Sequence, residues 1–102
     1  MTKILFISFA SFIFLYAQTN TEGEKVFKKY CWGCHHETSM AFGPPFSQIA
    51  KTRTKAQIVA HIFDPKSSYK TLGYKRSVMP SFDLTPQEYD AIVSYIYSCK
   101  KE

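Results

Sequence analysis

The feature that most constrains this chain of 102 residues is the sequence CWGCH at positions 31–35. Its two cysteines, Cys31 and Cys34, are three residues apart, so that on a helical turn both side chains lie on the same side. His35 follows directly. This C-x-x-C-H spacing is typical of covalent haem attachment: two thiols form thioethers to the vinyl groups on one porphyrin edge, and the next imidazole binds the iron.

Two other kinds of site share part of this pattern. A C-x-x-C redox disulfide belongs to a βαβ context, which the chain does not show. A structural zinc ion needs two further ligands at short spacing, and only His36 and His61 are available. We therefore predict one covalent haem c, attached through Cys31 and Cys34, with His35 as an axial iron ligand.

The second axial ligand of the haem iron is predicted from the remaining sulfur and nitrogen side chains. Met79 follows a long loop and precedes a proline that stiffens the backbone, and we predict that it is the ligand. Met40 is only five residues after His35 and is poorly placed to reach the opposite haem face. His61 is the alternative, giving bis-histidine ligation, although its apolar neighbours favour a half-buried helix position. His36 is interpreted as a neighbour of the ligand.

The N-terminal segment has the layout of a secretory signal peptide. Lys3 provides a positive start, an apolar run interrupted by two serines follows, and Ala17 offers a small residue for cleavage. The run is short for a membrane span, so an uncleaved anchor is the alternative. We predict a signal peptide over residues 1–17 and one haem domain over residues 18–102, located in the periplasm with no stable membrane span after cleavage.

Hydrophobic spacing predicts an all-α fold with four to five short helices. The last helix is the clearest, because Thr85 and Glu88 form a T-x-x-E capping box with Pro86 at the first helical position. Its predicted apolar stripe consists of Tyr89, Ile92, Val93, Ile96 and Tyr97. Earlier helices are expected at residues 21–30, 46–51 and 54–63. Loops are expected at residues 36–46 and 66–84.

Over residues 21–99 the chain resembles the class I cytochromes c. Gly23 and Phe27 precede Cys31 by eight and four residues, as in the N-terminal helix of the family. The sequence GPPF at positions 43–46 is similar to the Gly-Pro-x-Leu segment of the family, and IVSYI at positions 92–96 is similar to its C-terminal helix.

The resemblance implies the cytochrome c fold, with the helices wrapped around one covalently bound haem. It implies that Gly23 permits a close helix crossing against Ile92 and Tyr95. It also implies that the carbonyl of Pro44 accepts a hydrogen bond from Nδ1 of His35, which orients the ring and strengthens its donation to iron. A weaker likeness, in the segments 62–65 and 79–82, is to small cytochromes that serve periplasmic sulfur oxidoreductases.

The predicted function is one-electron transfer, not enzyme catalysis, because a haem with two protein ligands has no open position for substrate. The first hypothesis is a periplasmic carrier between a respiratory donor and a terminal oxidase or peroxidase. The alternative is a haem subunit, or dedicated acceptor, of a periplasmic dehydrogenase. A third hypothesis is a sensor or enzyme with a labile sixth ligand.

The formal net charge of +5 bears on partners. The segment 51–76 is basic and contains a single acid, Asp64; it either steers an acidic redox partner or is an ordinary solvated surface. Export and modest charge argue against nucleic-acid binding. The predicted candidates for binding the haem carboxylates are Arg53, Tyr69, Tyr74 and Trp32. Cys99 is interpreted as buried in the last helix, or alternatively as part of a mixed disulfide with a partner.

Overall fold

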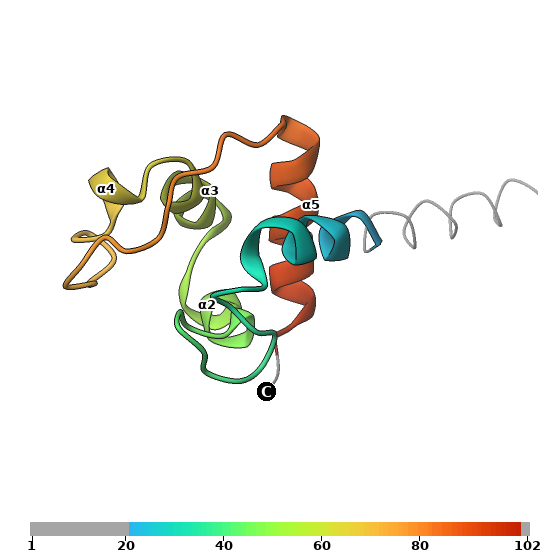
Figure 1. Ribbon diagram of the computed structural model, residues 1–102, viewed down its shortest axis with the longest axis horizontal. Helices are drawn as coiled ribbons and strands as arrows, with labels where there is room; N and C mark the ends of the chain where they lie inside the picture. Colours follow the sequence, from blue (N-terminus) through green and yellow to red (C-terminus); the bar gives the residue numbers. More distant parts are fainter. Residues whose placement is uncertain (1–20, 101–102) are drawn as a thin grey trace, which may run out of the picture.

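The computed structural model describes residues 21–100, and these residues form helices joined by loops (Figure 1). Within this range there is no strand, and the predicted all-α fold is confirmed. The predicted signal peptide, residues 1–17, lies outside the described residues. Residues 21–26 are α-helical and continue into the wider turn η1. The elements that follow are η1 (Phe27–Cys31), α2 (Phe46–Thr52), α3 (Lys55–Phe63), α4 (Pro65–Ser68) and α5 (Pro86–Ser98).

Two helices begin at threonine capping boxes. The Thr85 side chain accepts from the Glu88 backbone N–H at 3.1 Å, and the Glu88 carboxylate accepts from the Thr85 N–H at 3.0 Å. Thr54 and Gln57 form the same reciprocal pair at the start of α3, at 3.2 and 2.8 Å. Each cap satisfies donors that the helix itself leaves unpaired and contributes about 1 kcal/mol. The predicted start of the last helix is therefore confirmed.

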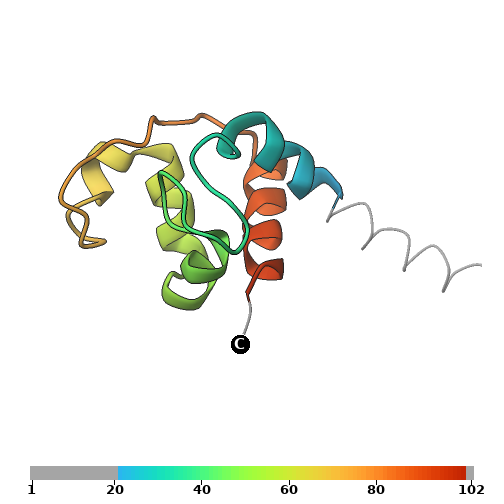
Figure 2. The same cartoon turned by 60° about the horizontal axis from the view of Figure 1, so that its bottom comes forward.

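The N-terminal helix crosses α5 where Gly23 removes any side chain between them (Figures 1 and 2). A Cβ on Gly23 would collide with the carbonyl oxygen of Ala91 and lie 2.7 Å from Cβ of Tyr95. The expected contact with Tyr95 is confirmed, and the nearest atom is the carbonyl oxygen of Ala91, which was not predicted. Residues 91 and 95 are one helical turn apart and share a face, whereas Ile92 is rotated into the core and is fully buried.

Aromatic rings fill the space beside this crossing. The Phe27 ring is 1% exposed and lies 5.1 Å from the Phe46 ring of α2 and 5.4 Å from the Tyr95 ring of α5. The hydroxyl of Tyr95 donates to Oε2 of Glu37 at 3.3 Å, which connects α5 to the segment after the cysteines. Burial, followed by the negative charge of Glu37, raises the pKa of Tyr95 to about 12.

The predicted apolar stripe of α5 is correct except at its last member. Ile92, Val93 and Ile96 are buried in the core, but Tyr97 is 37% exposed. Its hydroxyl donates to the backbone carbonyl of Arg53 at 3.0 Å. A tyrosine suits the edge of an apolar stripe, because its ring packs on the protein while its hydroxyl reaches a polar partner.

The segment 66–84 contains one short helix that was predicted as loop. Helix α4 begins with Pro65 at its first position, where the missing N–H and the fixed φ angle of proline suit a helix start. Beyond α4 the chain is a loop that ends beside the core. There the Phe82 N–H donates to the carbonyl of Ile62 at 3.0 Å, and the Tyr89 hydroxyl donates to the carbonyl of Phe82 at 2.9 Å.

No helix within residues 21–100 is both long and apolar enough to span a bilayer.

We predict that Gly23→Ala lowers the free energy of unfolding by about 1–3 kcal/mol, the usual cost of overpacking a tight contact. The added methyl group collides with backbone of α5, which cannot rotate away as a side chain can. Chemical denaturation of the haem-loaded protein measures the loss. Gly33→Ala is the matched control, since a Cβ there meets nothing within 4 Å. Equal losses in the two variants would contradict a special role for the crossing.

Candidate haem site

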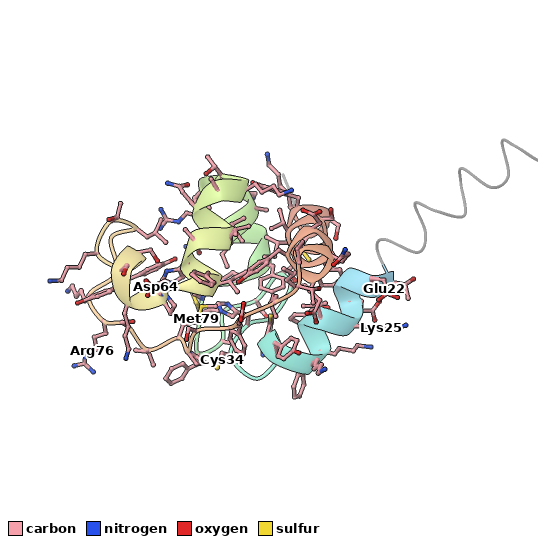
Figure 3. The ribbon with its side chains drawn as sticks, turned by 90° about the horizontal axis from the view of Figure 1, so that it is seen from above. Glu22, Lys25, Cys34, Asp64, Arg76 and Met79 are labelled. Carbon is pink, nitrogen blue, oxygen red and sulfur yellow. The ribbon has the colours of Figure 1, made fainter. Side chains whose placement is uncertain are left out.

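A largely apolar cavity of about 260 Å³ lies between the CWGCH segment, helices α2, α3 and α5, and the loop before α5. One water molecule needs only about 10–15 Å³ of such space, so the cavity is large enough to take a ligand. Cys31, Cys34, His35 and Met79 all contribute to its wall. In Figure 3, Cys34 and Met79 are labelled in the same region of the molecule, beside α3. The fold thus brings Met79, which is predicted separately, to the same cavity as the CWGCH motif.

The two cysteines lie on a turn folded around the Cys31 carbonyl. This oxygen accepts from the Cys34 N–H at 3.1 Å and from the His35 N–H at 3.0 Å. The Cys34 side chain is exposed and that of Cys31 is half-buried. Burial, followed by the proximity of Cys34, raises the pKa of Cys31 to about 11, so in the haem-free chain it is a neutral thiol at pH 7.

The orientation of the His35 ring is fixed from two sides. Its Nδ1 lies 2.7 Å from the carbonyl oxygen of Pro44. A carbonyl only accepts, so Nδ1 carries the proton, and the Nε2 lone pair is left for a metal. This is the contact that the resemblance implied. A Cβ on Gly43 would lie 2.6 Å from Cε1 of His35, so the glycine backbone packs directly on the ring.

The contact between Gly43 and the His35 ring was not predicted from the sequence. A glycine followed by proline is read locally as a loop signal, and nothing in its immediate neighbours indicates that the imidazole of residue 35 lies against it. The only available signal was its place immediately before Pro44, whose carbonyl was expected to bind the same ring.

The other candidates for the second axial ligand lie at different positions relative to the cavity. Met40 is 69% exposed and is not part of the cavity wall. His36 is also outside the wall, with its ring 6.4 Å from that of Trp32. His61 does line the cavity, and its Nδ1 lies 2.7 Å from Oγ of Ser68. Of the candidates for the second axial ligand, Met79 and His61 therefore line the cavity, and the assignment to Met79 stays a prediction.

The remaining predicted residues divide between the cavity and the core. Of the candidates for the haem carboxylates, Arg53 and Tyr74 lie in the cavity wall, whereas Trp32 and Tyr69 do not. Cys99 is buried in the core, and its sulfur lies 3.3 Å from the Tyr95 carbonyl oxygen. This placement favours the buried interpretation of Cys99 over a disulfide with a partner.

Comparison with known proteins gives a consistent result. The family model for cytochrome c matches residues 21–100. Among solved structures, a cytochrome c from Rhodothermus marinus is similar, with a TM-score of 0.64 and 22% sequence identity over 81% of this chain and 78% of that chain. At that identity the likeness shows a common fold. No curated protein sequence gives a significant match.

The residues of the cavity fit a covalently attached haem. Two thiols lie at one edge of an apolar wall, an oriented imidazole is beside them, and a thioether contributes to the same wall. These are the donor types that c-type haem iron takes, and apolar surroundings suit the porphyrin ring.

We predict that Gly43→Ala disturbs the iron ligand and not only the stability. The added methyl group displaces the His35 ring from Pro44, which weakens the hydrogen bond that strengthens imidazole donation. Weaker donation stabilises ferric iron less, so the reduction potential of the haem-loaded protein rises. Electrochemical titration measures it, with Gly33→Ala as control. The same potential in Gly43→Ala, Gly33→Ala and wild type would contradict this role.

Proposed function

The chain belongs to the cytochrome c family, as a class I monohaem member with covalent haem c, and from this premise we propose that it is a periplasmic one-electron carrier with His35 and Met79 as axial iron ligands. Proteins of this family transfer electrons through the haem and are not enzymes. The observation that carries the finer proposal is the meeting of Cys31, Cys34, His35 and Met79 in one cavity wall.

The chain supplies what a carrier needs around its cofactor. When bound, the haem provides a one-electron couple between ferric and ferrous iron. The hydrogen bond to Pro44 holds His35 in one orientation. Met79 lies three residues before Phe82, whose backbone is bonded to α3 and to α5, so the loop end that carries the methionine is anchored at both helices. Iron ligands that stay in place in both oxidation states keep the structural reorganisation on electron transfer small.

A surface for redox partners lies at the mouth of the cavity. Phe42 and Val78 contribute to the cavity wall and are nevertheless 78% and 58% exposed. Lys75 and Arg76 are exposed close to Val78 in the sequence. An apolar patch with neighbouring positive charge favours an acidic partner surface. We include a respiratory donor and a terminal oxidase or peroxidase among the proposed partners.

Export is part of the same proposal. The apolar segment 1–17 has the layout of a cleaved signal peptide, and the domain that follows carries a cofactor typical of exported bacterial proteins of this family. The proposed location is the periplasm.

We predict that Met79→Ala abolishes the Fe–S charge-transfer band of the oxidised protein and lowers its reduction potential, since thioether ligation favours ferrous iron. It also opens the sixth position, so the reduced protein binds carbon monoxide promptly. Met40→Ala is the matched control, because Met40 is exposed and lies outside the cavity wall. Survival of the band in Met79→Ala would assign the ligand elsewhere, with His61 as the first candidate. Prompt carbon monoxide binding by wild type would instead favour a sensor or enzyme.

A haem subunit of a periplasmic dehydrogenase is the second candidate function. The observation that favours it is the exposure of Trp32 and Phe42, at 59% and 78%, on the CWGCH segment and the loop after it. Exposed large apolar side chains are typical of surfaces that are covered in a complex.

Purification from the native source distinguishes the two functions. For a carrier we expect the protein to elute alone from gel filtration, and for a subunit we expect a second chain in fixed ratio. A Phe42→Ser variant then identifies the surface: it should release the second chain, while Phe63→Ser, at a ring of α3 that is 58% exposed, should not. A second chain in fixed ratio would contradict the carrier proposal.

A further inference from the structure

Helix α3 is apolar on two opposite faces, and the cavity uses only one of them. The cavity face consists of Gln57, Ile58, His61 and Ile62. The opposite face carries four apolar residues at spacings of three and four, which places them on one side of the helix. This outer stripe consists of Ala56, Val59, Ala60 and Phe63. Helix α3 lies beside α5 (Figure 2), and the stripe, Lys55 and the Tyr89 ring line a second, open groove.

The groove is exposed to solvent in the part of the chain that the structure describes. The Phe63 ring is 58% exposed, and Ala56 and Ala60 are exposed as well. Tyr89 contributes its ring and not its hydroxyl, because the hydroxyl donates to the carbonyl of Phe82. A contiguous exposed apolar stripe, unlike a single exposed side chain, is typical of a surface that another molecule covers.

The order of residues along the outer stripe makes it complementary to itself. When two copies of a helix pack antiparallel about a two-fold axis, each contact occurs twice, with the roles of the copies exchanged. With the axis between Val59 and Ala60, the small side chain of Ala56 faces the large Phe63 ring of the second copy. Each ring then fills the space above an alanine, as ridges fill grooves in packed helices.

The same register pairs opposite charges at both ends of the outer stripe. Lys55 directly precedes the stripe and Asp64 directly follows it, so the two-fold axis places each opposite the other. Lys55 is paired with Asp90 at 2.8 Å, but both side chains are more than half exposed, and such a pair is exchanged at little cost. A stripe with a base at one end and an acid at the other favours a second copy over a partner of uniform charge.

We propose that the protein forms a weak symmetric dimer in which the outer stripes of two α3 helices pack antiparallel. This inference goes beyond the proposed carrier function, because the groove shares no residue with the cavity. Phe42 and Val78, at the mouth of the cavity, are outside the groove, so the dimer presents two surfaces for redox partners. It contains only this chain, which distinguishes it from a complex with a dehydrogenase.

The size of the outer stripe determines how strong the dimer is. Helix α3 has nine residues, so the stripe is only about 13 Å long. Stable interfaces bury about 1,200–2,000 Å² in total, and two such short helix faces lie at or below the lower end of that range. We therefore expect single chains in dilute solution and dimers at high protein concentration.

Sedimentation equilibrium of the haem-loaded protein from about 1 μM to about 1 mM tests the proposal. For wild type we expect the average mass to rise from that of one chain toward that of two. Phe63→Ser should raise the dissociation constant at least about tenfold, because buried aromatic rings are typical hot spots of interfaces. Met40→Ser is the matched control and should leave the constant unchanged, since Met40 is exposed but lies outside the groove.

Exchange of the two charges tests the antiparallel register. Lys55→Glu sets two acids against each other, and Asp64→Lys sets two bases against each other, so each variant should weaken the dimer. The double variant restores opposite charges and should recover the association of wild type. The Asp64 carboxylate also accepts from the Ser67 hydroxyl at 2.7 Å. Should Asp64→Lys disturb α4 for this reason, Lys55→Glu and Phe63→Ser still decide.

Four results would overturn the proposal. The first is the mass of one chain at every concentration. The second is a dimer equally stable in wild type and Phe63→Ser, which would place the contact elsewhere. The third is a weakened dimer in both single charge variants, folded as wild type, without recovery in the double variant. The fourth is a different chain that co-purifies with wild type from the native source and is lost in Phe63→Ser, which would assign the groove to another protein.

Discussion

The close crossing of the N-terminal helix over α5 is the constraint on which the site depends. Gly23 fixes the crossing point, and Cys31 lies eight residues further along the same helical segment. Phe27 lies between them and is buried against both α2 and α5. The crossing therefore places the first cysteine at the edge of the cavity. The turn that follows then brings Cys34 and His35 to the wall.

Features determined by neighbours in the sequence were predictable. The capping box at Thr85, the spacing of Cys31 and Cys34, and the helical period of α5 are all local, and the structure confirms the helix start and the buried stripe as far as Ile96. The convergence of Met79 with the cysteines needed more than local pattern. It followed from the chemistry expected of the motif, which demands a second ligand at a distance in sequence.

Features determined by tertiary contact were not predictable in detail. Whether Ala91 or Ile92 faces Gly23 depends on the rotation of α5 about its axis, and a shift of one residue changes the answer by about 100°. Tyr97 lies at the exposed edge of α5, where its hydroxyl donates to the Arg53 carbonyl, a partner far away in the sequence. The packing of Gly43 on the His35 ring is also a tertiary contact. It was not predictable because glycine has no side chain whose chemistry indicates a contact.

The cavity also explains how so short a domain builds a core. Ile58 and Ile62 of α3 and Ile92 and Ile96 of α5 are buried, and the same four side chains line the cavity. Their apolar surface is thus shared between the protein core and the haem. Small domains bury a modest fraction of their surface and need additional apolar contacts. A covalently held porphyrin provides them, because its apolar surface is buried when the chain folds around it, and the site and the fold form a single unit.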